Sequence, residues 1–364
     1  MIDEKRIRQA LQSVLHPKLK KSLVDIGMIR DIRIKGEVVT LTLALKSDRS
    51  PLEKVFTGEI ETIVGALPGV SSVQVEVIAL SEKEYNRLFP KAPLKGIEKV
   101  KHFLAVASGK GGVGKTTTAV NVALALAKQG LNVGLLDADV YGPSVPLMLG
   151  LSNTLDQKDN MIVPKEKYGL RIMSLGMTAG KDEAFIWRGP LVSKMIHQLL
   201  GQVKWGELDY LVLDLPPGTG DPSITIAQAI SNCSILMVTT PQEVALADVR
   251  RSIALFNKIG QPIIGLVENM SYFVCGHSAK PIDIFGSGGG EKLSQESDIP
   301  LFGAIPIDLE LRQGGDTGVP LMVSSPNSST GLVFQAIALK ITDRTKSFES
   351  ISGWQTRVRD DCKV

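Results

Sequence analysis

A glycine-rich stretch at residues 109–116, Gly-Lys-Gly-Gly-Val-Gly-Lys-Thr, has the residue types and the spacing of a phosphate-binding loop. The apolar run 103–107 before it predicts a buried strand, and the apolar spacing of residues 120–127 after it predicts a helix. Because a strand, a glycine loop and a helix in this order aim backbone N–H groups at one anion, we expect a nucleotide site rather than a chance turn. Lys115 should reach the β- and γ-phosphates, and the Thr116 hydroxyl should bind Mg²⁺. The predicted ATP-binding residues of the loop are Gly109, Lys110, Gly111, Gly112, Val113, Gly114, Lys115, Thr116 and Thr117.

Aspartates end two further apolar runs that predict strands. Residues 132–136 lead into Asp137 and Asp139, and residues 209–214 end in Asp214. In α/β proteins ligands bind where the carboxyl ends of such strands meet, beside the phosphate loop. Asp214 is expected to hold Mg²⁺ through a water, and Asp139 to orient the attacking water or a water bound to Mg²⁺. Asp137 is expected to support the magnesium shell or the loop. Alternatively, Asp137 and Asp139 only cap the turn that follows them.

The segment 215–221, Leu-Pro-Pro-Gly-Thr-Gly-Asp, predicts a switch loop. Gly218 lies shortly after Asp214, from where its N–H could donate to the γ-phosphate. A loop that is ordered by the γ-phosphate and released after hydrolysis acts as a switch. A tight Pro-Gly turn is the alternative, and the pairing with a phosphate loop favours the switch.

Length and composition restrict the possible functions. With 364 residues the chain exceeds the size at which one core stops growing, so two domains are expected. The net charge of +3 and the lack of a basic block do not suggest nucleic-acid binding. No apolar run reaches the ~18 residues that span a bilayer, and the charged N-terminus lacks a secretory apolar region. Three cysteines form no disulfide framework, so a cytoplasmic protein is expected. Cys233 begins a predicted buried strand and should be core, and Cys362 has no assigned role.

Hydrophobic periodicity divides the chain into four segments. Residues 1–80 predict a small α+β domain with the element order α-β-β-α-β. Residues 81–100 are charged and contain prolines, as linkers do. From 101 to 342 strands alternate with helices, which predicts a mostly parallel, doubly wound α/β sheet with helices on both faces. Residues 343–364 are polar without a sustained period and predict a peripheral tail. The expected strands of the sheet are 103–107, 132–136, 170–175, 209–214, 234–239 and 262–267.

Lys110 indicates which class of phosphate loop the sequence resembles. The string Lys-Gly-Gly-x-Gly-Lys-Thr that starts there resembles the deviant loop of the nitrogenase iron protein, MinD and ParA class of ATPases. In that class the extra lysine contacts nucleotide bound by the other subunit, so the resemblance implies a homodimer with ATP buried between subunits. A cation at the γ-phosphate stabilises charge that develops during phosphoryl transfer. A solvated loop lysine is the alternative. The predicted catalytic residues are therefore Lys110, Lys115 and Asp139.

Further strings extend the resemblance over nearly the whole chain. The phosphate-loop string 108–127, DADVYGPS (137–144), DLPPGTGD (214–221) and ENMSYFVC (268–275) together resemble the Mrp-type iron–sulfur cluster carrier ATPases. Residues 22–30 are similar to the MIP18-type domain that precedes the ATPase in bacterial members. The resemblance implies a protein that binds an iron–sulfur cluster and passes it to apoproteins, with slow ATP hydrolysis controlling the cycle. The implied partners are apoprotein acceptors and other iron–sulfur assembly proteins.

The resemblance also implies residues for the base and for the cluster. Asn269 would read the adenine ring and Pro306 would flank it, although a turn asparagine is common. Carriers of this family place a Cys-x-x-Cys pair after the ENMS string, so that two subunits offer four thiolates to a [4Fe–4S] cluster. Here Cys275 is present, but Ser278, a poorer ligand for iron, replaces the second cysteine. His277 could complete a mixed Cys/His set with Cys275, or both are ordinary loop residues.

Three functions are compatible with these residues. The favoured one is an ATP-hydrolysing cluster carrier or scaffold that works as a nucleotide-bridged homodimer. The second is an adaptor that docks partners through residues 1–80 and uses ATP as a conformational lock, which the missing second cysteine favours. The third is a positioning ATPase of the MinD or ParA kind, against which the weak basic character and the lack of a membrane-targeting helix argue.

Overall fold

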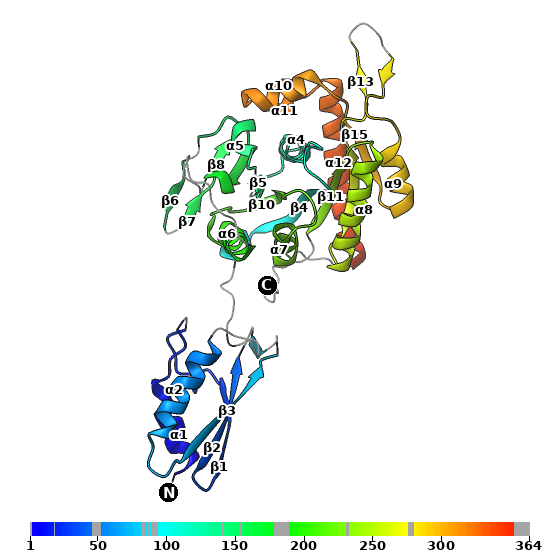
Figure 1. The fold of residues 1–364 in the computed structure, drawn as a ribbon. Coiled ribbons are helices and arrows are strands. Elements are labelled where there is room, and N and C mark those ends of the chain that lie inside the picture. The colour runs from blue at the N-terminus through cyan, green and yellow to red at the C-terminus, as the bar shows by residue number, and fades with distance from the viewer. Residues whose placement is uncertain are drawn as a thin grey trace. The chain divides into compact units, whose positions relative to one another are not determined.

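The computed structural model describes most of the chain in two separate units. It covers residues 2–17, 19–45, 52–81, 84, 85, 88, 94–139, 142–152, 154–159, 161–177, 189–230, 233–275 and 280–352. The chain divides into Met1–Ala92 and Pro93–Val364, and each unit has its own core (Figure 1).

The N-terminal unit has the predicted element order. Its elements are α1 (Glu4–Ala10), the 3₁₀ turn η1 (Leu11–Ser13), β1 (Ile29–Lys35), β2 (Val38–Leu45), α2 (Glu53–Gly65) and β3 (Ser72–Ala79). β1 and β2 form an antiparallel hairpin, and β3 adds parallel to β2. The two helices cover one face of this sheet, where Ile7, Leu41, Phe56 and Ile60 are fully buried. The opposite face carries charged pairs such as Arg33–Glu76, so the sheet alternates apolar-in and polar-out.

The second unit contains an eight-stranded sheet of the predicted doubly wound kind. Its strands are β4 (Val100–Ser108), β5 (Val133–Asp137), β8 (Lys165–Lys167), β9 (Leu170–Ser174), β10 (Leu208–Asp214), β11 (Ser234–Thr239), β12 (Ile263–Glu268) and β15 (Leu301–Ala304). They lie in the order β15-β12-β11-β4-β10-β5-β9-β8, and every neighbouring pair is parallel except β8 with β9. The six expected strands are confirmed. The two edge strands were not predicted from the sequence, because β8 is short and charged and β15 spans four residues.

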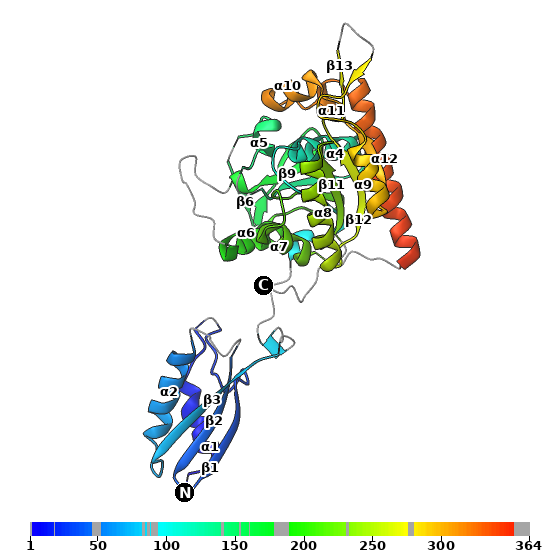
Figure 2. The same ribbon diagram turned by 45° about the vertical axis from the view of Figure 1, so that its right-hand side comes forward.

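Helices cover both faces of this sheet (Figure 2). On one face lie α4 (Lys115–Lys128), α11 (Leu321–Ser324) and α12 (Ser329–Ser352), and on the other lie α6 (Gly189–Gln202), α7 (Asp221–Ala229), α8 (Glu243–Lys258) and α9 (Gly289–Ser297). Successive residues of β4 join opposite cores, Leu104 with α4 and Ala105 with α8. Strands buried on both faces explain why these runs are apolar throughout.

Shorter elements complete the second unit. They are η2 (Lys95–Ile97), α5 (Val145–Met148), β6 (Asp156–Lys158), β7 (Met161–Val163), η3 (Leu175–Met177), β13 (Phe273–Val274), β14 (Pro281–Ile282) and α10 (Leu309–Thr317). β13 and β14 form an antiparallel hairpin that projects beyond the carboxyl edge of the large sheet (Figure 1).

The C-terminal segment differs from the expected peripheral tail. Helix α12 continues through residue 342 to Ser352, and Thr345 within this extension is 6% exposed. The apolar side chains of Phe334, Ile337 and Ile341 anchor the helix to the core, and an anchored helix is extended at little further cost. Residues 353–364, with Cys362, lie outside the described residues. Among the described helices, none combines the length and the apolar character needed to cross a bilayer.

Candidate nucleotide-binding site

The phosphate loop lies between β4 and α4, as the glycine motif predicts. β4 ends at Ser108 and α4 begins at Lys115. Gly112 and Gly114 adopt left-handed backbone angles, with φ of +79° and +84°, which side chains other than glycine rarely adopt. Gly109 packs against α8 so closely that a Cβ there would lie 2.4 Å from the backbone of Asp248. The loop is thus shaped by its own glycines and by helix packing, and it presents the N-terminus of α4 to an anion.

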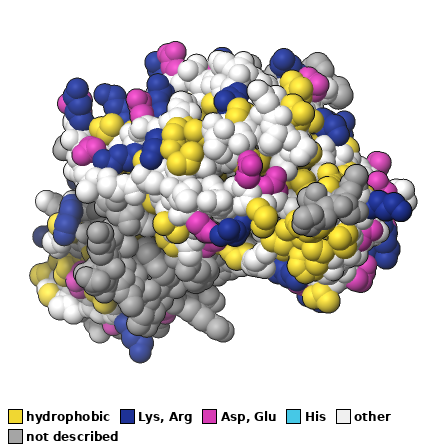
Figure 3. Space-filling view, turned by 90° about the horizontal axis from the view of Figure 1, so that it is seen from above, with side chains coloured by type: hydrophobic (Ala, Val, Ile, Leu, Met, Phe, Trp, Pro, Cys, Tyr) yellow, Lys and Arg dark blue, Asp and Glu magenta, His cyan; other side chains and the backbone are white. Residues whose placement is uncertain are grey.

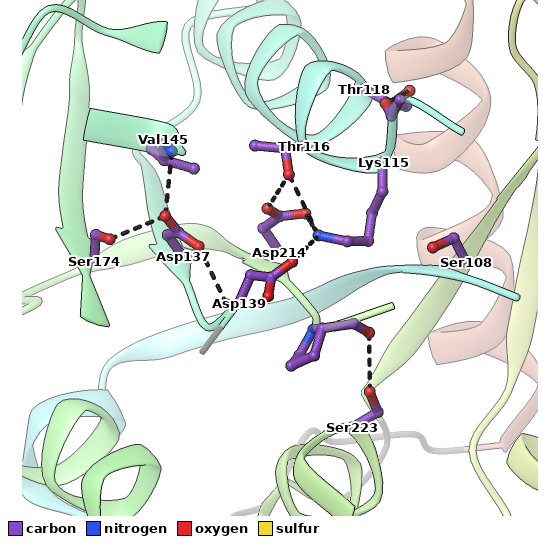
Figure 4. A network of polar contacts seen from close by, with 12 residues as sticks. Ser108, Lys115, Thr116, Thr118, Asp137, Asp139, Val145, Ser174, Asp214 and Ser223 are labelled. Carbon is purple, nitrogen blue, oxygen red and sulfur yellow. Dashed lines mark hydrogen bonds and ion pairs between the residues drawn. The ribbon is translucent and has the colours of Figure 1, made fainter. Parts of the chain in front are cut away.

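Two carboxylates from neighbouring strands meet the loop side chains (Figure 4). Lys115 Nζ donates to Asp214 Oδ1 at 2.6 Å and lies 3.6 Å from Asp139 Oδ2. The Thr116 hydroxyl donates to the second oxygen of Asp214 at 2.7 Å. Lys115 is 6% exposed and Asp214 is fully buried. Burial raises the pKa of Asp214, and the charge and hydrogen bond of Lys115 oppose that shift. The sequence therefore identified four residues that the fold brings together: Lys115, Thr116, Asp139 and Asp214.

Asp137 uses its carboxylate to hold the turn that carries Asp139. It accepts hydrogen bonds from the backbone N–H groups of Asp139 and Val145, both at 3.2 Å, and from the Ser174 hydroxyl at 2.9 Å. Burial, together with the nearby charge of Asp214, raises the pKa of Asp137 to about 7. Asp137 is thus a positioning residue for the turn. Ser174 went unnoticed in the sequence, although it is a polar residue at the carboxyl end of a predicted buried strand.

The predicted switch glycine contacts the strand that leads into the phosphate loop. Gly218 has a φ of +81°, and its N–H donates to the Ser108 carbonyl at 2.9 Å. The Ser223 hydroxyl on α7 donates to the Pro216 carbonyl at 3.1 Å, which ties the start of this loop to a helix. A contact between the Gly218 N–H and a γ-phosphate therefore requires that the N–H leave Ser108.

The remaining predicted nucleotide residues lie near the same edge of the sheet. Asn269 directly follows β12, and its side-chain Nδ2 donates to the Val113 carbonyl in the phosphate loop at 2.8 Å. Pro306 is buried shortly after β15, and Lys110 is half-buried in the loop. The roles of Asn269 and Pro306 at the base, and of Lys110 across a dimer, stay predictions.

The predicted cluster residue lies on the projecting hairpin. Cys275 directly follows β13, is half-exposed and has a free thiol. Four exposed apolar side chains belong to the same region, Val274, Ile282, Ile284 and Phe285. Figure 3 shows the molecule from the top of the view in Figure 1, and on this face apolar patches lie between charged side chains. His277 and Ser278 lie outside the described residues.

Two further observations concern metal and thiol chemistry. Within the described part of the chain, no group of three or more His, Cys, Asp or Glu side chains is placed to hold a metal ion. Cys233 is fully buried, as predicted for a core residue, and burial raises the pKa of its thiol to about 12. Cys233 is therefore neither a thiolate ligand nor a nucleophile.

Comparison with known proteins agrees with this geometry. A family model described as NUBPL iron-transfer P-loop NTPase matches residues 99–342, and one described as iron-sulfur cluster assembly protein matches residues 4–77. The iron-sulfur cluster carrier protein of Synechocystis is 44% identical over 350 residues, which cover 94% of this chain and 98% of that protein. The chain belongs to this family of iron-transfer P-loop NTPases. The resemblance to Mrp-type carriers with an N-terminal MIP18-type domain is thereby confirmed.

Solved structures support the same fold for this NTPase. A nucleotide-binding protein from Archaeoglobus fulgidus in complex with ADP is 36% identical, with a TM-score of 0.54 over 61% of this chain and 88% of that chain. The cell division ATPase MinD of Pyrococcus furiosus is 23% identical, with a TM-score of 0.51 over 67% of this chain and 99% of that chain. The second likeness shows the shared fold of the P-loop unit.

Proposed function

We propose that this NTPase binds and hydrolyses ATP as a nucleotide-bridged homodimer in the cytoplasm, and carries an iron–sulfur cluster that it delivers to apoproteins. The observation that supports the nucleotide part most directly is the bonded group of buried Lys115, half-buried Thr116 and buried Asp214 at the phosphate loop, with Asp139 beside it. The family and the named carrier relatives support the cluster part.

Binding of a triphosphate would rearrange the pairs of this site. In the structure the Lys115 ammonium pairs with the buried Asp214 carboxylate at 2.6 Å. A β,γ-phosphate pair offers Lys115 a stronger anionic partner, so its ammonium would turn from Asp214 toward the phosphates. The Thr116 hydroxyl and the Asp214 carboxylate are the oxygen donors that Mg²⁺ prefers, and they lie side by side, so Thr116 would bind the ion directly and Asp214 through a water. Bound there, Mg²⁺ would supply positive charge for the phosphate oxygens.

Hydrolysis would follow from the arrangement of charges around the γ-phosphate. Asp139, held by Asp137, would orient the attacking water. Lys110 from the partner subunit would stabilise the negative charge that develops on the transferred phosphoryl group. Movement of the Gly218 N–H from Ser108 to the γ-phosphate would close the switch loop, and phosphate loss would reopen it.

The cluster would be cargo held between two copies of the projecting hairpin. Two Cys275 thiolates are too few for the four-thiolate set common in [4Fe–4S] proteins, so we propose that His277 supplies the remaining protein ligands. The apolar side chains around Cys275 would exclude water from such a site. A second candidate is an adaptor that uses ATP as a lock and holds no cluster, and the Ser278 substitution favours it.

Anaerobic reconstitution separates the two functions. The wild-type protein is incubated with iron and sulfide, and bound iron and sulfide are counted per dimer together with the visible absorption of the cluster. The carrier function predicts a cluster that Cys275→Ala loses and that the matched variant Cys233→Ala keeps. If the wild-type protein takes up no iron, the carrier function is wrong and the adaptor is supported.

A further inference from the structure

One short segment, Glu268–Cys275, connects the phosphate loop to the cysteine hairpin. It begins at the end of β12, next to the loop, and ends at Cys275 after β13. Hydrogen bonds and strand pairings with defined partners hold its path. The segment therefore offers a physical connection between the two places that a nucleotide-driven carrier must couple.

The connection starts at the Asn269 side chain. Its Nδ2 donates to the Val113 carbonyl at 2.8 Å, and the two residues are 5% and 2% exposed. A trans peptide plane points its C=O and its N–H in opposite directions, and the described chain contains no cis peptide bond. Holding the Val113 carbonyl toward Asn269 therefore turns the Gly114 N–H away from Asn269. This N–H belongs to the residue that caps α4, where a phosphate is expected.

The contact is closely fitted. A Cβ on Gly114 would lie 2.0 Å from Asn269 Nδ2, so the carboxamide occupies the space that only glycine leaves open. The backbone of Asn269 is fixed as well, because its N–H donates to the Thr239 carbonyl at the end of β11 at 2.8 Å. The side chain of Asn269 is thus bonded to the phosphate loop while its backbone is bonded to β11.

Beyond Asn269 the segment is paired with the strand-like stretch after β15. The Ile305 N–H donates to the Glu268 carbonyl at 2.7 Å, and the Ser271 N–H donates to the Ile305 carbonyl at 3.0 Å. The Ile307 N–H donates to the Tyr272 carbonyl at 2.7 Å. These bonds lead directly into β13 and leave the connection with little freedom before it reaches Cys275.

The bend in this connection lies at Met270. Its φ of +55° is in the left-handed region, which costs a residue with a side chain on the order of 1 kcal/mol. The Glu268 carboxylate braces the bend, because it accepts from the Ser271 hydroxyl and from the Gly290 N–H at the start of α9. The bend is held by its surroundings and not by its own preference.

We infer that Asn269 is a positioning residue that aligns the phosphate loop and passes the state of the loop to the Cys275 hairpin. It acts through the Val113 carbonyl at one end and through the paired segment 270–273 at the other. The inference rests on the proposed nucleotide binding, but it does not require that a cluster binds. It also differs from a contact with the adenine ring, since alignment of the loop matters for any polyphosphate.

The first test compares ATP with inorganic tripolyphosphate, which has no base. Asn269→Asp preserves the side-chain size but points an oxygen at the Val113 carbonyl. We expect the affinities for ATP and for tripolyphosphate both to fall about tenfold or more, since a buried carbonyl loses its donor. Asn257→Asp, on the exposed side of α8, is the matched control and should change neither affinity. Weaker ATP binding with unchanged tripolyphosphate binding would assign Asn269 to the base alone and overturn the inference.

The second test measures the reactivity of Cys275, at the hairpin end of the segment 268–275. In a Cys362→Ser background, the half-exposed Cys275 thiol is alkylated with a maleimide, with and without saturating tripolyphosphate. We expect the ligand to change the alkylation rate about fivefold or more, and Asn269→Asp to abolish this response at saturation. Equal responses in both proteins would overturn the inference. Because no iron is present, a failed cluster reconstitution would refute the carrier function and leave this result intact.

A second variant guards against misfolding of Asn269→Asp. Met270→Gly removes the left-handed strain and lets the bend flex, without changing either end of the connection. Tripolyphosphate affinity should stay within about twofold of the wild-type value, whereas the Cys275 response should fall by about half or more. A full Cys275 response in this variant would contradict the connection.

Discussion

The phosphate loop and the Cys275 hairpin lie at the same edge of the large sheet, but they are built very differently. The loop joins a nine-residue strand to a 14-residue helix, and buried side chains and close helix packing fix its shape. The hairpin has two strands of two residues each and exposes its apolar side chains. One chain thus fixes the shape of its own phosphate loop, whereas the short hairpin leaves Cys275 half-exposed beside apolar side chains that a second copy would cover.

The largest effect is expected at Lys115, the buried lysine of the phosphate loop. Lys115→Ala removes the phosphate ligand and leaves the buried Asp214 carboxylate unpaired, which costs about 3–5 kcal/mol in comparable buried pairs. We expect ATP binding to disappear in calorimetry and the free energy of unfolding to fall. Lys128→Ala, at the exposed end of the same helix, is the control and should change neither. Undiminished ATP affinity without Lys115 would mean that the loop is not the nucleotide site.

The next effect tests whether the stability of the fold depends on the close packing of particular glycines in the phosphate loop. Gly114→Ala places a Cβ against Asn269 at a φ of +84°, whereas Gly111→Ala meets no atom within 4 Å. We expect Gly114→Ala to lower the free energy of unfolding by about 2 kcal/mol and to weaken ATP binding. Gly111→Ala should leave the free energy of unfolding unchanged. Urea denaturation of the two proteins decides the matter, and equal stabilities would refute the close fit.

A smaller effect concerns the pH dependence of the free energy of unfolding, to which the buried carboxyl group of Asp137 contributes. Its pKa is raised from 3.8 to about 7 in the folded protein, so the folded state binds this proton more tightly than the unfolded state. The contribution to stability is complete below the unfolded value and is lost as the pH rises through about 7. Asp137→Asn should remove this decrease, on the order of 1–3 kcal/mol between about pH 4 and about pH 8. Parallel stability curves for both proteins would contradict the assignment.

The smallest effect compares Cys233 in the buried core with Cys275 on the hairpin. Cys233→Ser places a hydroxyl in the packed core and should cost about 1–3 kcal/mol of unfolding free energy. Cys275→Ser, on the hairpin, should change it by less than about 0.5 kcal/mol. Thermal unfolding of the apoproteins measures both. A large loss with Cys275→Ser would show that the hairpin is as tightly packed as the loop.

The sequence predicted the phosphate loop and the strands around it better than the Cys275 hairpin, for physical reasons. A phosphate loop is encoded locally, because the glycines, the lysine and the hydroxyl are neighbours in the chain, and strands buried on both faces are apolar throughout. The bond between Asn269 and Val113 spans 156 positions, and that between Gly218 and Ser108 joins the loop after β10 to the end of β4, so no local pattern reveals them. The length of α12 was also missed, since its last turns are polar and depend on the anchored part before them.

The mass of the protein in solution with and without nucleotide tests whether ATP bridges two copies of the chain. Sedimentation is measured for the apoprotein, without iron, in the presence and absence of a slowly hydrolysed ATP analogue with Mg²⁺. We expect the analogue to shift the wild-type protein from one copy to two, and Lys110→Ala to weaken the shift. A mass that is the same with and without the analogue would contradict a dimer bridged by ATP.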